Sequence, residues 1–434
     1  MPILVFTSGR DTVLARDNQG EGARDVDAIL ADLAQHWPLY TAIPFVAALI
    51  GYVTKRVAIE MMFRPLEFKG IKGTFLGWQG VVPQHGGRMA AIATDLLTQN
   101  LLDIKDVFAR IDPDRITKEI EQPLLRAVDD VAREVLEQTH PRVWERLPSV
   151  AQDLVIKQIQ AQTPHMVRQL MLEMRENVDD FLDVKEMTVR RLTSDKKLLV
   201  KLIRETSRPE MAFIARSGIY FGFVLGIVQA VVWAVTKNPL VMPIFGAAVG
   251  LFTDWLAIKL IFVPREPVYI TRKLYFQGKF QRRKAEVAQQ YGEIIARDVL
   301  TVPNLMESIL SGPRSDRLMA MISRTVAEAI DEQTSSARPL VNATIGGKRL
   351  EEMKRAAADK SIARLPETVR HAEGYLTEAM DVARLVEERM SKLTPVEYEG
   401  LLRPAFRQDE WKLVVVGGLI GGVVGELQVL VMLH

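Results

Sequence analysis

Four apolar runs, each about as long as a membrane is thick, alternate with two long regions of helical periodicity. Residues 217–236, "SGIYFGFVLGIVQAVVWAVT", carry no charge, and at about 1.5 Å per residue they span roughly 30 Å of hydrocarbon. The run at 413–433 is interrupted only by Glu426. Two further runs, 38–63 and 239–262, are as long but contain charges. We predict four membrane segments, with a re-entrant segment as the alternative for the two charged runs.

The regions between these runs, about 66–211 and 265–411, follow the period of an α-helix. Apolar residues recur there at i, i+3, i+4 and i+7, and strand patterns are nearly absent. The periodic positions of residues 121–174 include Leu124, Leu125, Val128, Val131, Ala132, Val135, Val150, Leu154, Val155, Ile159, Met166, Leu170 and Met174. Pro164 predicts a break or kink. The fold class is therefore all-α, and each amphipathic face either packs in a core, lines an apolar groove or lies on a membrane.

The chain repeats itself at a constant offset of about 199 positions. "IGYVTKRVAIEMMFRP" (50–65) aligns with "VGLFTDWLAIKLIFVP" (249–264), and "GFVLGIVQ" (222–229) aligns with "GGVVGELQ" (421–428). "FLGWQG" (75–80) and "KLYFQG" (273–278) share their Gln-Gly end. These matches predict a two-fold internal duplication: an N-terminal segment, 1–36, is followed by one module at 37–237 and a second at 238–434. An even number of segments separates equivalent elements, so the two modules insert in the same orientation.

The placement of basic residues orients the segments. Lysines and arginines cluster where the first and third segments end and where the second and fourth begin, whereas the turn between the second and third holds one lysine. By the positive-inside rule both helical regions are cytoplasmic arms, and residues 1–36 are extracytoplasmic. We expect a multi-pass protein of the bacterial inner (plasma) membrane. The opening stretch "MPILVFTSGRDTVLARDNQGEGARD" lacks the basic and then apolar pattern of a signal peptide.

Composition excludes several classes of chemistry. The net charge of +2 does not favour nucleic acid as a partner. The chain has no cysteine, and its six histidines lack metal-binding spacing. Nucleophile-elbow, P-loop and dinucleotide-binding motifs are also missing. We therefore expect no enzymatic activity, no cofactor and no metal site.

The paired motifs resemble a bacterial membrane-protein family known as domain of unknown function 445. "GYVTKRVAIEMMFRP" and "GLFTDWLAIKLIFVP" are similar to its G-x-x-T-N-W-L-A-I-K-M-L-F-R-P signature, and "GGLIGGVVGELQ" is similar to its last glycine-rich helix. Lys55 and Asp254 stand where that family has asparagine. The resemblance covers nearly the whole chain. It implies an integral inner-membrane protein with a helical cytoplasmic body, and it carries over no catalytic residue.

The charges inside the repeated motif are candidates for a contact between the modules. Lys55 aligns with Asp254, and Glu60 aligns with Lys259, with opposite signs in both columns. A pseudo-two-fold axis would bring each pair together as two ion pairs that fix the register of the halves. The alternative is that the helices leave the membrane near Thr54 and Thr253, so that the charges lie in headgroups or water.

Glycines four residues apart are candidates for a packing seam. The motif G-x-x-x-G-x-x-Q predicts close helix contact between the second and fourth segments, or between protomers. Its residues are Gly222, Gly226, Gln229, Gly421, Gly425 and Gln428. Glu426 lacks a counterpart in the first module and is a candidate membrane carboxylate, acting as a partner for a neighbouring basic residue or as a transport site.

The basic stretch after the third segment is a candidate patch for anionic lipid headgroups. It comprises Arg272, Lys273, Lys279, Arg282, Arg283 and Lys284. The alternative is ordinary flanking charge of the positive-inside type.

These patterns favour a non-enzymatic inner-membrane protein that acts as an envelope scaffold or handles lipid through its amphipathic helices. The alternative is a transporter of a small solute, an ion or a lipid. Four segments are few for a transport pathway, so that function requires an oligomer. Membrane lipids are the expected partners, and a homo-oligomer or a protein bound to the cytoplasmic helices are the further options.

Overall fold

The computed structural model describes residues 30–71, 77–139, 141–269, 271, 275–334, 347–407 and 410–433. The chain forms two compact units, and both halves of the sequence contribute to each. We call Met1–Gln84, Ile203–Arg283 and Leu402–His434 the apolar-helix unit, and His85–Leu202 and Lys284–Leu401 the cavity unit. The two units therefore cut across the two modules expected from the repeat.

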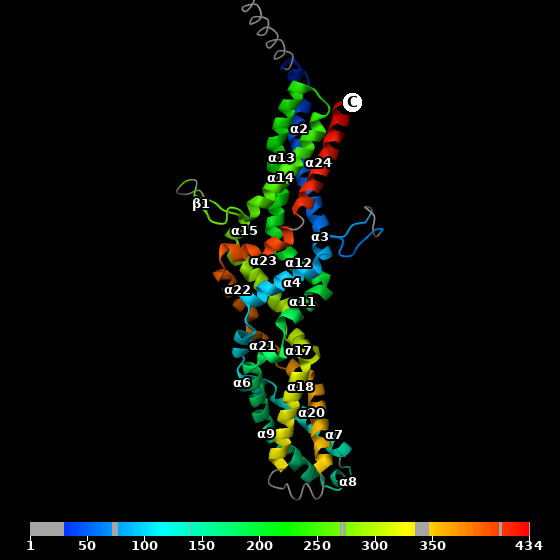
Figure 1. Ribbon diagram of the computed structural model, residues 1–434, viewed down its shortest axis with the longest axis vertical. Coiled ribbons are helices and arrows are strands. Elements are labelled where there is room, and N and C mark those ends of the chain that lie inside the picture. The colour runs from blue at the N-terminus through cyan, green and yellow to red at the C-terminus, as the bar shows by residue number, and fades with distance from the viewer. Residues whose placement is uncertain are drawn as a thin grey trace, which may run out of the picture. The chain divides into compact units, whose positions relative to one another are not determined.

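The apolar-helix unit contains four long helices (Figure 1). They are α2 (Trp37–Phe63), α13 (Arg208–Thr236), α14 (Val241–Phe262) and α24 (Glu410–Leu433). α2 packs along α13, and α14 packs along α24. Each of α2 and α14 ends before a cis X-Pro bond and is followed by a hairpin and a short helix. These short elements are α3 (Val81–Gln84), the antiparallel strands β1 (Val268–Tyr269) and β2 (Tyr275–Phe276), and α15 (Lys279–Arg282).

The described residues of the cavity unit form helices joined by short turns and contain no strand. From the first half it takes α4 (Gly86–Leu96), the π-helix η1 (Leu97–Leu101), α5 (Ile104–Ala109), α6 (Pro113–Glu119), α7 (Glu121–Thr139), α8 (Pro141–Trp144), α9 (Ser149–Glu176), α10 (Val178–Phe181) and α11 (Val184–Ser194). From the second half it takes α16 (Lys284–Ile294), the π-helix η2 (Ile295–Val299), α17 (Val302–Ser311), α18 (Ser315–Thr334), α20 (Gly347–Arg370), α21 (Glu373–Met380) and α22 (Val382–Lys392). Helices α12 (Lys196–Thr206) and α23 (Pro395–Arg407) contribute residues to both units.

Along most of α13, small and polar residues are buried and large apolar ones are exposed. The buried positions include Ser217, Gly218, Gly222 and Gly226. The exposed large apolar side chains of the same helix are Ile219, Tyr220, Phe223, Val224, Ile227, Val228, Val231 and Val235. A water-soluble bundle has the opposite distribution, because water expels apolar surface. In lipid, small residues favour association by letting backbones approach.

Among the residues that the structure describes, three helices are long and apolar enough to cross a membrane: Trp37–Phe63, Arg208–Thr236 and Val241–Phe262. Within α24 the described residues contain a shorter apolar stretch, Val414–Leu430. The structure therefore has the character of an all-α membrane protein, and the predicted segments at 38–63 and 239–262 are continuous helices rather than broken ones.

The glycine motifs do not form the seam that their sequence suggested. Gly218 lies against Gly51 of α2, and Gly222 lies so close to Ala47 that a Cβ on Gly222 would be 2.6 Å from the Ala47 carbonyl oxygen. In the other pair, Gly421 lies against Gly246 of α14. Each glycine face thus packs on the preceding membrane-type helix of its own half. The prediction that these glycines pack between the second and fourth segments is wrong, because each of these helices turns its glycines to the preceding helix, α2 or α14. The alternative, a contact between protomers, stays a prediction.

The same local structures recur at equivalent places in the two halves of the sequence. The Gln79 amide donates to the Leu66 carbonyl, and the Gln277 amide donates to the Arg265 carbonyl. Gly80 N–H donates to Pro65 O, and Gly278 N–H donates to Pro264 O, both at 2.9 Å. A Cβ on either glycine would clash with the end of the preceding helix. The Gln-Gly dipeptide therefore closes each hairpin onto the end of a long helix. The two π-helices, η1 and η2, also occupy matching places.

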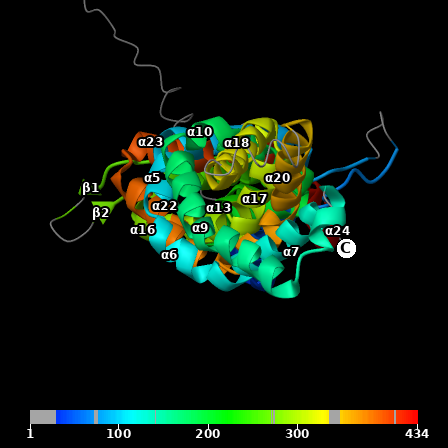
Figure 2. The same cartoon turned by 90° about the horizontal axis from the view of Figure 1, so that it is seen from below.

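Helices of the two halves interleave in the cavity unit. α7 contacts α9, α9 contacts α18, α18 contacts α20, and α20 contacts α7, which makes a closed ring (Figures 1 and 2). Side-chain caps begin several shorter helices: Asp103 accepts from Lys105 N–H, and Thr301 accepts from Asn304 N–H. The predicted break at Pro164 is absent, since α9 continues through it.

The close glycine contacts make a matched test in α24. Gly421→Ala places a methyl group onto the Gly246 carbonyl oxygen, whereas a Cβ on the adjacent Gly422 meets nothing nearer than 3.6 Å. Overpacking of this kind costs about 1–3 kcal/mol. We expect Gly421→Ala to lower the unfolding temperature of the protein in detergent micelles and Gly422→Ala to leave it unchanged or raise it. Equal effects of the two variants would contradict the assigned seam.

Candidate functional site

A buried ion pair joins the two halves inside the apolar-helix unit. Lys55 Nζ lies 3.5 Å from Asp254 Oδ1, and the side chains are 2% and 8% exposed. The same ammonium donates to the Thr253 carbonyl at 3.1 Å and to Ser217 Oγ at 3.3 Å. All three of its donors therefore have an acceptor. The second carboxylate oxygen of Asp254 lies directly against Gly417 of α24, and a Cβ on residue 417 would overlap that oxygen.

The pair lies toward the C-terminal end of α2. α2 has 27 residues, so it is about 40 Å long, while the hydrocarbon is about 30 Å thick. Lys55 lies about 27 Å along α2 from Trp37. The charges are nevertheless enclosed by helices, and not solvated by headgroups as the alternative interpretation required. A water-sized cavity of about 30 Å³ adjoins them, with a lining that is otherwise apolar.

The second predicted pair does not form. Glu60 instead accepts from Arg204 at 2.8 Å and pairs with Arg64 at 3.1 Å. Lys259 lies over the Trp255 ring, 4.7 Å from its centroid. Five residues separate the two charged columns, and at about 100° per residue they point some 140° apart. A helix that turns Lys55 toward the partner half therefore turns Glu60 away from it.

The membrane glutamines and Glu426 occupy different environments. Gln229 Nε2 donates to Gln428 Oε1 at 3.2 Å, so these two equivalent residues meet although their glycine faces do not. Nearby, the buried residues Ile43, Met242 and Val429 form a small apolar cluster. Glu426 is exposed on α24, and its side chain has no ion pair with any residue that the structure describes. The expected basic partner within the chain is therefore missing among those residues.

The predicted lipid-headgroup patch is only partly at the surface. Lys279 and Arg282 are exposed and stack on Phe213 and Tyr275, with charge-to-centroid distances of 4.3 and 5.3 Å. Arg272 and Lys273 lie outside the described residues.

Two of the patch residues serve the fold instead, which corrects their assignment. Arg283 pairs with the buried carboxylate of Glu210 at 2.7 Å. Lys284 donates to the carbonyls of Ser391 and Leu393, at the C-terminal end of α22. Burial lowers the pKa of the Lys284 ammonium. Both residues follow the hairpin closely in sequence, but their side chains satisfy internal acceptors.

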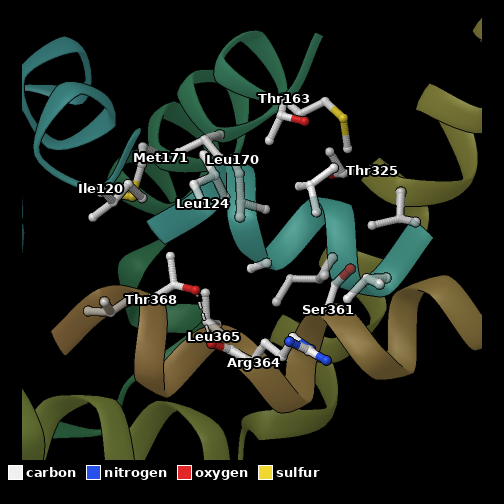
Figure 3. Close-up of a pocket in the computed structure, with 18 of the residues that line it drawn as sticks. Ile120, Leu124, Thr163, Leu170, Met171, Thr325, Ser361, Arg364, Leu365 and Thr368 are labelled. Atoms are coloured by element: carbon white, nitrogen blue, oxygen red, sulfur yellow. Dashed lines mark hydrogen bonds between the residues drawn. The ribbon is translucent and has the colours of Figure 1, made fainter. Parts of the chain in front are cut away.

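A cavity of about 580 Å³ lies inside the cavity unit. The ring of α7, α9, α18 and α20 supplies most of its lining (Figure 3). Helices α5, α6, α17 and α21, with Ile111 and Ile120 on either side of α6, supply the rest. Many positions of the amphipathic period point into it, namely Leu124, Val128, Val131, Ala132, Val135, Val155, Ile159, Met166, Leu170 and Met174. Val150 and Leu154, at the start of α9, are instead 69% and 63% exposed.

Few of the residues in this lining are polar, namely Gln158, Gln162, Thr163, Thr325, Ser361, Arg364 and Thr368, and the three threonines are engaged within their own helices. The hydroxyls of Thr163, Thr325 and Thr368 donate to carbonyls one turn earlier in their own helices, at 3.0–3.1 Å. The methyl groups of these threonines, rather than their hydroxyls, are then available for contact with other atoms. Six lining residues are methionines: Met166, Met171, Met174, Met306, Met353 and Met380. Methionine is flexible and polarisable, so such walls adapt to apolar ligands of varied shape.

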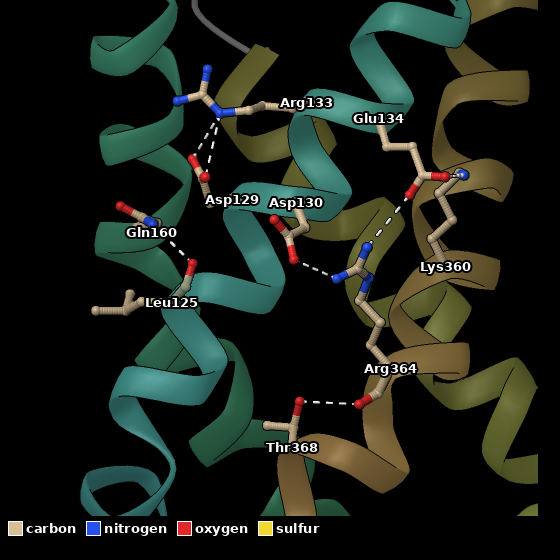
Figure 4. A network of polar contacts seen from close by, with 9 residues as sticks. All are labelled: Leu125, Asp129, Asp130, Arg133, Glu134, Gln160, Lys360, Arg364 and Thr368. Carbon is tan, nitrogen blue, oxygen red and sulfur yellow. Dashed lines mark hydrogen bonds and ion pairs between the residues drawn. The ribbon is translucent and has the colours of Figure 1, made fainter.

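A polar network on α7 holds the ring together (Figure 4). Arg364 of α20 pairs with Asp130 at 2.5 Å, and Lys360 pairs with Glu134 at 2.5 Å. Toward the other neighbour, the Gln160 amide of α9 donates to the Leu125 carbonyl at 2.9 Å. The hydrogen bond from Lys360, together with the Arg364 charge, lowers the pKa of Glu134. Arg364 also lines the cavity, whereas its partners Asp130 and Glu134 do not, and the network fixes the spacing of the helices.

No group of three or more metal-ligating side chains occurs within the described ranges. Sequence reasoning proposed the Lys55–Asp254 contact, beside the alternative that these charges lie in headgroups or water, and it predicted the amphipathic period of α7 and α9. It missed the two other acceptors of Lys55, Ser217 and the Thr253 carbonyl. The only sign of them in the sequence is that a serine stands beside the glycine face. It also missed the contribution of α17, α18 and α20 to the cavity, although these helices carry the same apolar period.

The apolar helices point to a membrane protein, and comparison with known proteins agrees. The chain is 29% identical over 94 residues to a UPF0754 membrane protein of Bacillus pumilus, covering 21% of this chain and 25% of that protein. It is 35% identical over 72 residues to one of Anoxybacillus flavithermus (16% and 20%), and 28% identical over 96 residues to one of Staphylococcus aureus (22% and 26%).

The chain thus spans about a quarter of the length of the curated relatives it matches. No family model matches it, and no solved structure matches it. The likenesses and the helices together indicate a bacterial membrane protein related to a family whose name assigns no activity.

The buried pair is tested with neutral replacements. Lys55→Met and Asp254→Asn each leave one buried charge alone, which costs about 3–5 kcal/mol. We expect each single variant to lower the unfolding temperature in detergent and the double variant to recover much of that loss, because no charge is then unpaired. Glu60→Gln and Lys259→Met provide the matched control, and their effects should add. Additive losses at Lys55 and Asp254 would rule out the coupling.

Proposed function

We propose that this chain is a non-enzymatic, multi-pass protein of the bacterial inner membrane that holds the acyl chains of lipids in the cavity of its helical unit. The observation that carries this proposal is the cavity of about 580 Å³ with its apolar, methionine-rich lining. The membrane character of the other unit supplies the source of such chains.

The lining of the cavity favours an occupant. Several apolar side chains that line it, such as Val155 and Ile159, remain accessible to water. Covering apolar surface contributes about 25 cal/mol per Å². An apolar ligand in the cavity would cover these side chains.

The shape of the site suits a flexible hydrocarbon rather than a rigid polar substrate. Drug-sized ligands occupy pockets of roughly 300–1,000 Å³, usually with a few convergent polar groups that fix orientation. Among the described residues of this lining Arg364 alone is charged, and it is held by Asp130 and Glu134. A ligand that needs no directional contacts, such as an acyl chain, fits this chemistry.

For the membrane part we infer four segments, produced by duplication of one module. The recurring Gln-Gly turns and π-helices support the duplication. Basic residues after α2 and α14 support a cytoplasmic position for both helical regions. We also infer membership of the domain-of-unknown-function family named above, on the strength of the paired signature motifs.

The alternative roles have less support. A transport site built on Asp254, Lys259 and Glu426 would need these groups to share a cavity, but only Asp254 lines the small one. A pure scaffold needs a closed core, and the large cavity argues against that. The exposed apolar residues Val150 and Leu154 favour a protein partner or a second copy of the chain at the start of α9.

The proposal is tested by filling the cavity. Ala357 of α20 lines it, whereas Ala363 of the same helix is exposed and does not. We expect full-length wild-type protein in micelles to bind a dansyl-labelled undecanoic acid saturably and unlabelled oleate to displace it. Ala357→Phe should abolish or strongly weaken binding, because its ring takes the space of the chain.

Ala363→Phe should bind as the wild type does. Thermal unfolding of both variants checks that they are folded. Saturable binding that Ala357→Phe leaves unchanged would place the ligand elsewhere and overturn the proposal. If the folded protein binds no fatty acid at all, the proposal is also overturned, and a scaffold role is favoured.

A further inference from the structure

Two hairpins project from the apolar-helix unit, one after each of α2 and α14. The first is closed by the bridge between Lys69 and Trp78, and the second by β1 and β2. Figures 1 and 2 both show them leaving the helices on opposite sides and sideways to the helix axes. Their bases are held by the Gln-Gly turns described above, so their positions relative to the long helices are defined.

The hairpins expose apolar and aromatic side chains. In the second hairpin Val268 is 53% exposed, Tyr269 70%, Tyr275 44% and Phe276 43%. In the first, Phe68, Ile71 and Trp78 are 38%, 62% and 36% exposed. In water these side chains would gain by burial, and strands of two residues are too short to provide it.

The level at which the hairpins leave the helices matches the membrane surface. α2 is about 40 Å long, while hydrocarbon and headgroups together measure about 40–45 Å. Phe63, where the first hairpin begins, therefore lies in the headgroup layer, and α14 ends at the equivalent residue, Phe262. An arm that runs sideways from this level lies along the membrane surface.

We propose that the two hairpins are interfacial anchors, which insert their aromatic side chains among the headgroups of the bilayer that holds the four helices. Tyrosine and tryptophan prefer this layer, because each combines an apolar ring with a polar group. The anchors extend the apolar belt of the long helices outward on both sides and resist tilting of the bundle.

The hairpins and their bases expose more basic than acidic residues, which fits anionic lipid. Among the described residues the exposed basic ones are Arg64, Lys69, Arg265, Lys279 and Arg282, and the exposed acidic ones are Glu67 and Glu266. Arg282 stacks on Tyr275, so the cation and the exposed ring share one surface. Basic residues near the membrane attract anionic headgroups. The inference needs the membrane assignment but does not need the cavity to bind lipid.

The absence of cysteine from the chain makes single-cysteine labelling a direct test. We replace Phe68, Tyr269, Val224 or Glu378 individually by cysteine, attach a nitrobenzoxadiazole fluorophore and reconstitute the protein in phosphatidylcholine–phosphatidylglycerol vesicles. Quenching is compared between lipids spin-labelled near the headgroup and lipids labelled deep in the acyl chain. Val224 is exposed in the middle of α13 and reports the bilayer centre, while Glu378 is exposed on α21 in the cavity unit.

We expect labels at positions 68 and 269 to lose more fluorescence to the shallow quencher, the label at 224 to lose more to the deep one, and the label at 378 to lose little to either. Added phosphatidylglycerol should increase quenching of the label at position 269 by the shallow quencher. Combining Tyr269→Cys with Lys279→Gln and Arg282→Gln should make that increase smaller.

Hairpin labels that respond like position 378 and remain open to aqueous iodide would overturn the proposal. So would hairpin labels shielded from both lipid and iodide, since another protein then covers them. A label at 224 that escapes the deep quencher would contradict the membrane assignment itself.

Discussion

Backbone contact at glycines is the constraint on which the apolar-helix unit depends. Gly218 against Gly51 and Gly421 against Gly246 bring helix axes together so closely that no side chain fits between them. Lipid is as apolar as leucine, so burial of large side chains gives no advantage there, and close packing supplies the attraction instead. Large residues are consequently left on the outside, and the surface becomes the apolar belt that lipid covers.

Close packing also creates the room for a buried ion pair. Asp254 lies against the bare backbone of Gly417, and its partner Lys55 reaches it from the other half of the chain. Desolvation offsets most of the attraction between the two charges, so the pair adds little net stability compared with an apolar pair of the same size. In the cavity unit the opposite arrangement holds. Helices kept apart by the Arg364–Asp130 and Gln160–Leu125 contacts enclose space that their own side chains do not fill.

Sequence periodicity predicted helices, apolar segments and inward-facing positions well. Those features depend on local geometry: the helical turn decides which side chains share a face, and the rise along the helix axis decides which segments can span a membrane. Partner choice was harder. Glu60 and Lys259 align as well as Lys55 and Asp254 do, yet only Lys55 and Asp254 meet. The helical rotation between the two aligned positions lets only one of the two pairs face the contact between the halves.

By itself, the sequence determined the all-α class, the membrane character and the location of the Gln-Gly turns, all of which follow from spacing along one chain. Only the tertiary structure decided which helix each glycine face meets, that Arg283 and Lys284 bind internal acceptors, and that the amphipathic faces of both halves surround one cavity. The physical reason is that an amphipathic face specifies only that it will be covered. What covers it, and how completely, depends on the spacing of elements far apart in the sequence.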